Sequence, residues 1–263
     1  PGVAGGPITG TVPPDFSFEL QVVADGFTFP DGSKTTLDVQ RDQFESAAAT
    51  VRVIAPDVPP NGSLRGTLEV LFLYEGNLCG RAMRMIAVGG NAVGGPPVAV
   101  ESTASVSIPE APPPDLTVMI SRGSADNRLV WSLTTPHDVA NQPTEPVATQ
   151  LDHMSAKSFA LDRIRSLSDW DKNPLTPSKL VGIGEEISKT MPVEFWLVLD
   201  GIWEKKQNAG DPAPSVLIVS ADPYVPWELA ATTDAFARAE RVDATKPPFL
   251  CAQVRVGRWI PPV

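Results

Sequence analysis

The stretch SVLIVSADPYVPWEL at residues 215–229 decides how the second half of this chain is interpreted. Its opening, Ser215 to Ser220, is an apolar run without polar alternation, which is typical of a strand covered on both faces of a sheet. In the loop that follows, Pro226 restricts the preceding residue to extended backbone. Trp227 is expected to be a buried anchor, and Glu228 to accept hydrogen bonds from backbone N–H groups of a short helix. A structural clamp at the edge of a sheet is favoured over a catalytic role for this pair.

Apolar residues at helical spacing predict helices before this strand. One helix is expected at 159–167, a second begins at Thr176, where a hydroxyl cap precedes a proline, and a third begins at Pro192. The third helix is expected to bury Phe195, Trp196, Leu199 and Trp203.

The rest of the second half alternates turn signals with short apolar runs. Residues 115–121 and 128–133 predict a hairpin, and residues 136–154, rich in proline and without periodicity, predict a long loop. A short helix at 234–241 and a last strand at 252–260 complete the prediction.

The first hundred or so residues have the alternation and turn spacing of an all-β domain. The expected strands lie at 16–22, 35–39, 49–54, 67–74, 82–88 and 98–108. The prolines at 109 and 112–114 predict an extended spacer. We therefore expect an α+β protein: an immunoglobulin-like β-sandwich at 1–110, followed by an α/β segment at 111–263 that is incomplete as a domain.

Composition excludes several classes of function. The formal net charge of −10 and the lack of a Lys/Arg run argue against nucleic acid as a partner. No transmembrane stretch and no signal peptide is present, although the first residue is Pro1 and a preceding signal could have been lost. Cys79 and Cys251 are the only cysteines, and they are expected to be buried free thiols of a reducing compartment, inert because burial raises a thiol pKa. The predicted location is the cytoplasm.

The sequence motifs that could indicate catalysis or the binding of a metal or cofactor are incomplete. His137 and His153, the only histidines, fall in the proline-rich loop and are assigned surface or loop-structuring roles, because no set of zinc ligands accompanies them. Gly182 and Gly184 do not follow a strand as a dinucleotide loop would, and are expected to allow close helix packing. The acidic pair Glu185-Glu186 is read as a solvated helix face. No catalytic, cofactor-binding or metal-binding residue is assigned, and no cofactor is expected.

The strand followed by Pro226-Trp227-Glu228-Leu229 resembles the signature of CHAT domains, which are caspase-like α/β peptidase domains of bacteria. The glycine-containing helix, the helix from Pro192 and the strand around 256–259 resemble the same family, over residues 115–260 in all. The resemblance implies a cysteine peptidase in which a His base and a Cys nucleophile lie at the ends of successive parallel strands. Both normally follow the Pro-Trp-Glu region, and the residues after Glu228 contain no His, so the dyad does not map onto this chain.

Two hypotheses follow from the residues and the resemblance. In the first, the chain is the scaffold and recognition portion of a CHAT-type peptidase of a bacterial conflict or signalling system, and the chemistry is supplied beyond Val263. In the second, it is a non-enzymatic adaptor whose β-sandwich binds a protein partner. A protein partner or protein substrate is expected in both cases, without nucleic acid or membrane. Enzyme activity, the identity of the partner and the oligomeric state stay open.

Overall fold

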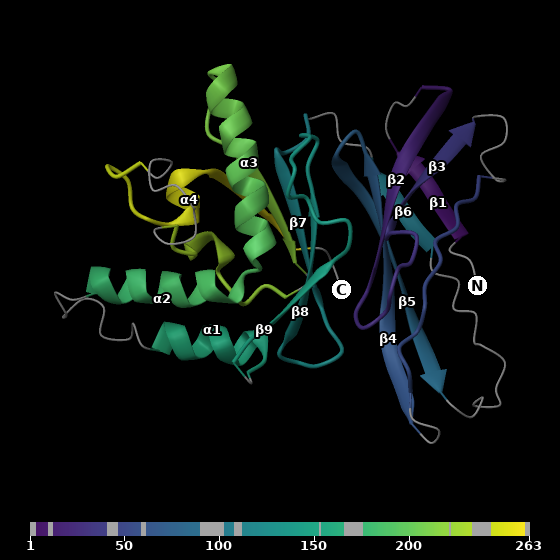
Figure 1. Ribbon diagram of the computed structural model, residues 1–263, viewed down its shortest axis with the longest axis horizontal. Coiled ribbons are helices and arrows are strands. Elements are labelled where there is room, and N and C mark those ends of the chain that lie inside the picture. Colours follow the sequence, from purple (N-terminus) through teal and green to yellow (C-terminus); the bar gives the residue numbers. More distant parts are fainter. Residues whose placement is uncertain are drawn as a thin grey trace. The chain divides into compact units, whose positions relative to one another are not determined.

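The fold is described from a computed structural model of the chain (Figure 1). The structure describes residues 4–9, 13–40, 47–58, 62–89, 103–107, 112–152, 154–165, 176–220, 222–232 and 243–260. The chain divides into two compact units, Pro1–Pro113 (unit 1) and Pro114–Val263 (unit 2). The mixed α+β class expected from the sequence is confirmed, since strands form two sheets and helices follow in the second half of the chain.

Unit 1 is built on a six-stranded sheet with strand order β1-β6-β5-β4-β2-β3. Its strands are β1 (Ala4–Thr9), β2 (Asp15–Ala24), β3 (Lys34–Gln40), β4 (Ser63–Tyr74), β5 (Asn77–Gly89) and β6 (Thr103–Ser107). Pairing is antiparallel except between β1 and β6, which run parallel. The predicted strands at 35–39, 67–74 and 82–88 are confirmed, and the expected strand at 98–108 is described over 103–107.

One face of this sheet carries an aromatic and aliphatic core. Phe18 and Leu20 of β2 are buried there, and Phe18 meets Phe72 and Tyr74 of β4 edge to face. The prediction of a strand at 49–54 is wrong: the segment 47–58 is irregular, with a single bridge between Ile54 and Thr28. Every second side chain of this segment is nevertheless half-buried against the core. The alternation in the sequence therefore reflects side-chain packing and not the backbone hydrogen bonds of a strand.

Unit 2 contains a five-stranded sheet with strand order β11-β10-β7-β8-β9. The strands are β7 (Leu116–Arg122), β8 (Arg128–Thr134), β9 (Val147–Gln150), β10 (Ser215–Ser220) and β11 (Arg255–Trp259). β7 and β8 form the predicted hairpin. The predicted strand at 215–220 is confirmed as β10, and it has a parallel partner on each side. The prediction of a loop throughout 136–154 is wrong in part, because the four residues of β9 pair with β8.

The helices of unit 2 lie together on one side of its sheet (Figure 1). They are α1 (Ala156–Arg165), α2 (Thr176–Thr190), α3 (Val193–Ala209) and the short α4 (Leu250–Gln253), with a 3₁₀ turn η3 at Trp227–Leu229. The starts predicted at Thr176 and Pro192 are confirmed, and the four residues expected to be buried on α3 are at most 7% exposed. The predicted helix at 234–241 lies outside the described residues.

Candidate functional site

Three neighbouring strands of unit 2, β7, β10 and β11, run parallel, so their starts gather at one edge of the sheet and their ends at the other. We call the first the amino edge, where Asp115, Ser215 and Arg255 lie at or just before the strand starts. The second is the carboxyl edge, where β7 ends at Arg122 and β10 at Ser220. Each edge holds one buried aspartate, and the surroundings of the two differ.

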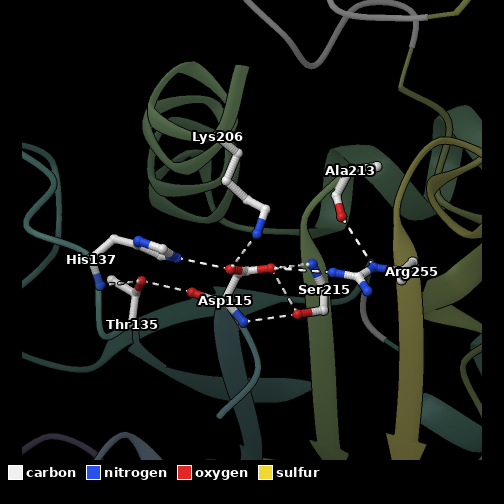
Figure 2. A network of polar contacts seen from close by, with 7 residues as sticks. All are labelled: Asp115, Thr135, His137, Lys206, Ala213, Ser215 and Arg255. Atoms are coloured by element: carbon white, nitrogen blue, oxygen red, sulfur yellow. Dashed lines mark hydrogen bonds and ion pairs between the residues drawn. The ribbon is translucent and has the colours of Figure 1, made fainter. Parts of the chain in front are cut away.

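At the amino edge, Asp115 joins the start of β7 to the start of β10 (Figure 2). Ser215 donates its backbone N–H to Oδ2 of Asp115 over 2.7 Å and its hydroxyl to the same oxygen over 2.8 Å. The backbone N–H of Asp115 in turn donates to Oγ of Ser215 over 3.0 Å. The starts of β7 and β10 are therefore fixed to each other by a reciprocal set of hydrogen bonds.

Basic side chains from three further segments surround the same carboxylate (Figure 2). Lys206, near the end of α3, places its Nζ 3.0 Å from Oδ1, and Nε2 of His137 lies 2.9 Å from that oxygen. Arg255 at the start of β11 lies 3.8 Å from Oδ2 and donates its Nε to the carbonyl of Ala213. His137 thus holds the loop after β8 to the sheet, which agrees with the loop-structuring role predicted for it.

These contacts determine the ionisation of Asp115. Burial is the largest single influence and by itself opposes ionisation, but the combined hydrogen bonds from Ser215, His137 and Lys206 outweigh it and lower the pKa of Asp115 to about 2. An acid that is ionised at neutral pH, with both oxygens already occupied, is a poor proton acceptor. The amino edge is therefore a structural site rather than a place for acid–base chemistry.

The carboxyl edge carries a different aspartate. Asp222 follows β10, and its side chain is 9% exposed. Its Oδ2 lies 3.2 Å from a guanidinium nitrogen of Arg122, whose side chain is 67% exposed. Ser220 donates its hydroxyl to the carbonyl of Asp222, and the backbone N–H of Tyr224 donates to Oδ1 over 3.4 Å. Within the described ranges, the carboxylate of Asp222 therefore contacts Arg122 and the backbone of its own loop.

The segment Pro226-Trp227-Glu228-Leu229, which follows Asp222 in the chain, holds the loop after β10 against neighbouring strands, and we call it the clamp. Trp227 is 1% exposed and meets Trp131 of β8 edge to face at 4.9 Å between ring centroids, as expected of a buried anchor. The expectation for Glu228 is wrong: its carboxylate pairs with the guanidinium of Arg258 on β11 over 3.2 Å, and no bond to a backbone N–H is seen in the described part of the chain. Sequence spacing gave no signal for this pair, because the two residues meet only once β11 lies beside β10.

Close packing at Gly184 supports the same clamp. A Cβ at this position would lie 2.6 Å from the carbonyl oxygen of Leu229, and the carbonyl of Gly184 accepts a hydrogen bond from the N–H of Ala231 over 2.8 Å. The predicted role in close helix packing is confirmed for Gly184, whereas a Cβ at Gly182 would meet open space, so the prediction is wrong for that glycine.

The cysteines separate into one buried and one exposed thiol. Cys79 is buried, as predicted, and burial raises its pKa. The prediction for Cys251 is wrong: it lies on α4 rather than in a strand, and it is exposed. Its pKa is still raised, first by partial burial and then by the nearby Glu228 carboxylate. A thiol with a raised pKa is a weak nucleophile at neutral pH.

Two further observations bear on function. The described residues contain no group of three or more His, Cys, Asp or Glu side chains placed to hold a metal ion, and His153 lies outside them. None of the helices in the described ranges is long and apolar enough to span a bilayer.

The fold and its contacts define a mixed α+β protein whose second unit has three neighbouring parallel strands, β11, β10 and β7, on one side of its sheet. The chain matches no protein-family model, no curated protein and no solved structure.

Proposed function

We propose that this chain is the scaffold and recognition portion of a CHAT-type, caspase-like cysteine peptidase, whose His–Cys dyad is supplied beyond Val263. In this proposal unit 2 is the beginning of a caspase-like α/β domain and unit 1 is an immunoglobulin-like docking module. The protein acts on protein substrates in the bacterial cytoplasm, in a conflict or signalling system.

The observation that carries it is the aligned carboxyl edge of β7 and β10, backed by the Pro-Trp-Glu-Leu clamp. In open α/β sheets, ligands bind outside the carboxyl ends of parallel strands. A caspase-like mechanism needs its base and nucleophile at such strand ends, held on a rigid sheet. The buried Trp227, which packs against Trp131 of β8, and the Glu228–Arg258 pair supply that rigidity by holding the loop after β10 to β8 and β11.

The test is the reading frame beyond the codon for Val263 in the source DNA. The proposal expects a continuation of about 100–150 residues, a domain's length, with a His and a Cys at the ends of successive apolar strands. The longer product should cleave protein substrates, and the present 263 residues should cleave neither casein nor a peptide library. A stop codon directly after Val263 would overturn the peptidase proposal.

A specific surface favours the adaptor as the second candidate. Met83 and Met85 of β5 are 47% and 79% exposed on the same face of the strand. Exposed methionines are overrepresented on surfaces that bind varied protein partners. If the gene contains a start codon shortly before Pro1 and ends at Val263, unit 1 is the part to use in a search for that partner.

A further inference from the structure

We propose that the outer side of strand β3 in unit 1 is a self-association surface, to which a second copy of this chain adds its own β3 in antiparallel orientation. β3 is the last strand of the six-stranded sheet, and among the described strands only β2 pairs with it. The inference concerns unit 1 alone and goes beyond the proposed function, because it does not depend on a peptidase.

The backbone of β3 directs alternate residues away from the sheet. Just before the strand, the N–H of Val22 donates to the carbonyl of Ser33 over 2.7 Å, and these two residues continue the β2–β3 register. In an antiparallel ladder, hydrogen-bonded pairs alternate with pairs that are not hydrogen-bonded. Lys34, Thr36 and Asp38 therefore direct their N–H and C=O groups away from β2.

This side of β3 lacks the devices that most firmly protect the last strand of a sheet. Natural sheets block such strands with proline, with a β-bulge, or by keeping them very short. β3 is seven residues long, contains no proline and pairs with β2 in unbroken register. Thr36 and Asp38 are exposed. The outer backbone of β3 is therefore a template to which another strand can add.

The charges on β3 favour a second copy as that strand. In an antiparallel pair of β3 strands that is symmetric about Thr36, Lys34 of each copy stands opposite Asp38 of the other. Moving the centre of symmetry by one residue to Leu37 removes both charge pairs. Moving it to Asp38 places the two aspartates opposite each other. One register therefore gives two opposite-charge pairs, and the neighbouring registers give none.

Both charged side chains have capacity left for this pairing. Lys34 contacts Glu19 over 3.0 Å, and its ammonium carries three N–H donors. Asp38 accepts the hydroxyl of Ser17 at Oδ1 over 2.6 Å, and a carboxylate can accept several hydrogen bonds through its two oxygens. The pair between the copies adds to these contacts without breaking them.

The apolar side of the strand also matches itself. In the same register Leu37 of one copy lies beside Thr35 of the other, on the sheet face that carries the core of unit 1. Leu37 is half-buried and already packs against that core, so pairing would continue the apolar face across both copies. The contact between two short strands is small, and the dimer is expected to be weak, with a Kd of about 10–100 μM.

The experiment measures the mass of the 263-residue chain by sedimentation equilibrium at concentrations of about 5–500 μM, which bracket the expected Kd. Two variants reverse one charge each, Lys34→Glu and Asp38→Lys. The matched controls reverse the charges of the exposed pair between Arg52 and Asp31, also in unit 1. Arg52→Glu alters the net charge as Lys34→Glu does. Asp31→Lys does the same for Asp38→Lys.

The wild-type chain should dimerise, and each β3 variant alone should dimerise at least about ten-fold more weakly, because each creates two like-charge pairs in the symmetric dimer. When Lys34→Glu and Asp38→Lys are mixed in equal amounts, they should form a heterodimer, since both of its charge pairs then join opposite charges. The two controls should dimerise as the wild-type chain does.

A wild-type chain that stays monomeric at about 500 μM overturns the proposal, and a strand of a different protein is then the alternative occupant of β3. A dimer that Lys34→Glu and Asp38→Lys do not weaken, or that the controls weaken equally, overturns it as well. Mixing separates lost pairing from lost folding, and a mixture that stays monomeric contradicts the register. None of these outcomes involves catalysis, so they are independent of the reading-frame test.

Discussion

The amino edge and the carboxyl edge terminate the same parallel strands, but they surround a buried aspartate in opposite ways. Asp115 accepts two hydrogen bonds from Ser215 and also contacts Lys206, His137 and Arg255, which come from separate segments. In the described part of the chain, Asp222 contacts one exposed arginine and the backbone of its own loop. The first carboxylate is therefore tied to several segments of the fold, whereas the second has far fewer contacts.

The difference separates two kinds of buried charge within one sheet. A carboxylate with partners from several segments stabilises the fold in proportion to those contacts. A carboxylate whose cationic partner is mostly exposed contributes less to stability. Substitutions at the two edges should therefore differ in their effect on the free energy of unfolding.

The largest expected effect tests whether packing rather than charge holds the carboxyl edge. Trp227→Ala should destabilise unit 2 by about 3–5 kcal/mol, the usual range for a fully buried aromatic side chain. Trp227→Phe should cost only about 1–1.5 kcal/mol, because a ring is kept and the indole N–H has no acceptor among the described residues. Urea unfolding followed by circular dichroism measures both. A change near zero for the alanine variant would mean that the ring is not buried.

The next effect tests whether the amino edge is held by charge. Asp115→Asn should destabilise unit 2 by about 2–3 kcal/mol at pH 7, because hydrogen bonds to a charged group are lost while Lys206 stays in place. The size of the loss should depend on pH, which distinguishes it from that of Trp227→Ala.

The sign of that pH dependence follows from the lowered pKa. The folded-state pKa of Asp115 is about 2, below its usual value of 3.8, so the stability from its ionised form is complete above about pH 4 and is lost as the pH falls towards 2. The wild-type chain should lose about 2 kcal/mol through this window that Asp115→Asn does not lose. Parallel pH profiles of the two proteins would refute the account of the amino edge.

A smaller effect is expected at the other aspartate. Asp222→Asn should cost about 1 kcal/mol, because the amide retains the contact with the Tyr224 backbone and loses an ion pair whose arginine is mostly exposed. Denaturant midpoints of Asp115→Asn and Asp222→Asn, measured side by side, compare the two edges directly. A loss at Asp222 as large as that at Asp115 would contradict the difference between the two edges.

The sequence predicted what depends on local pattern. The buried strand 215–220, the hairpin in unit 2, the start of α3 at Pro192 and the anchor Trp227 each follow from short-range spacing or turn chemistry. Both edges escaped prediction, because they depend on which strands become neighbours. Asp115 and Ser215 are far apart in the sequence and meet only when β10 pairs with β7.

The errors have the same physical origin. Segment 49–54 has the alternation of a strand, but it packs its side chains on a sheet without backbone pairing beyond one bridge. The four residues of β9 are too few to show a period, so the sequence predicts a loop there. The strand predicted at 252–260 begins only at Arg255, because Ala252 and Gln253 belong to the short helix α4.

That last error leads to the smallest predicted effect. Because Cys251 is exposed on α4 and Cys79 is buried, a thiol reagent should modify Cys251 in the folded chain and reach Cys79 only after denaturation. The reaction at Cys251 should still be slower than that of a cysteine in an unfolded peptide, because partial burial and Glu228 raise its pKa. Cys251→Ser should change the free energy of unfolding by no more than about 0.5 kcal/mol, as is usual for surface positions. Mass spectrometry of the singly labelled protein identifies the site; labelling of Cys79 first would show that the β5 region of unit 1 opens more readily than its packing implies.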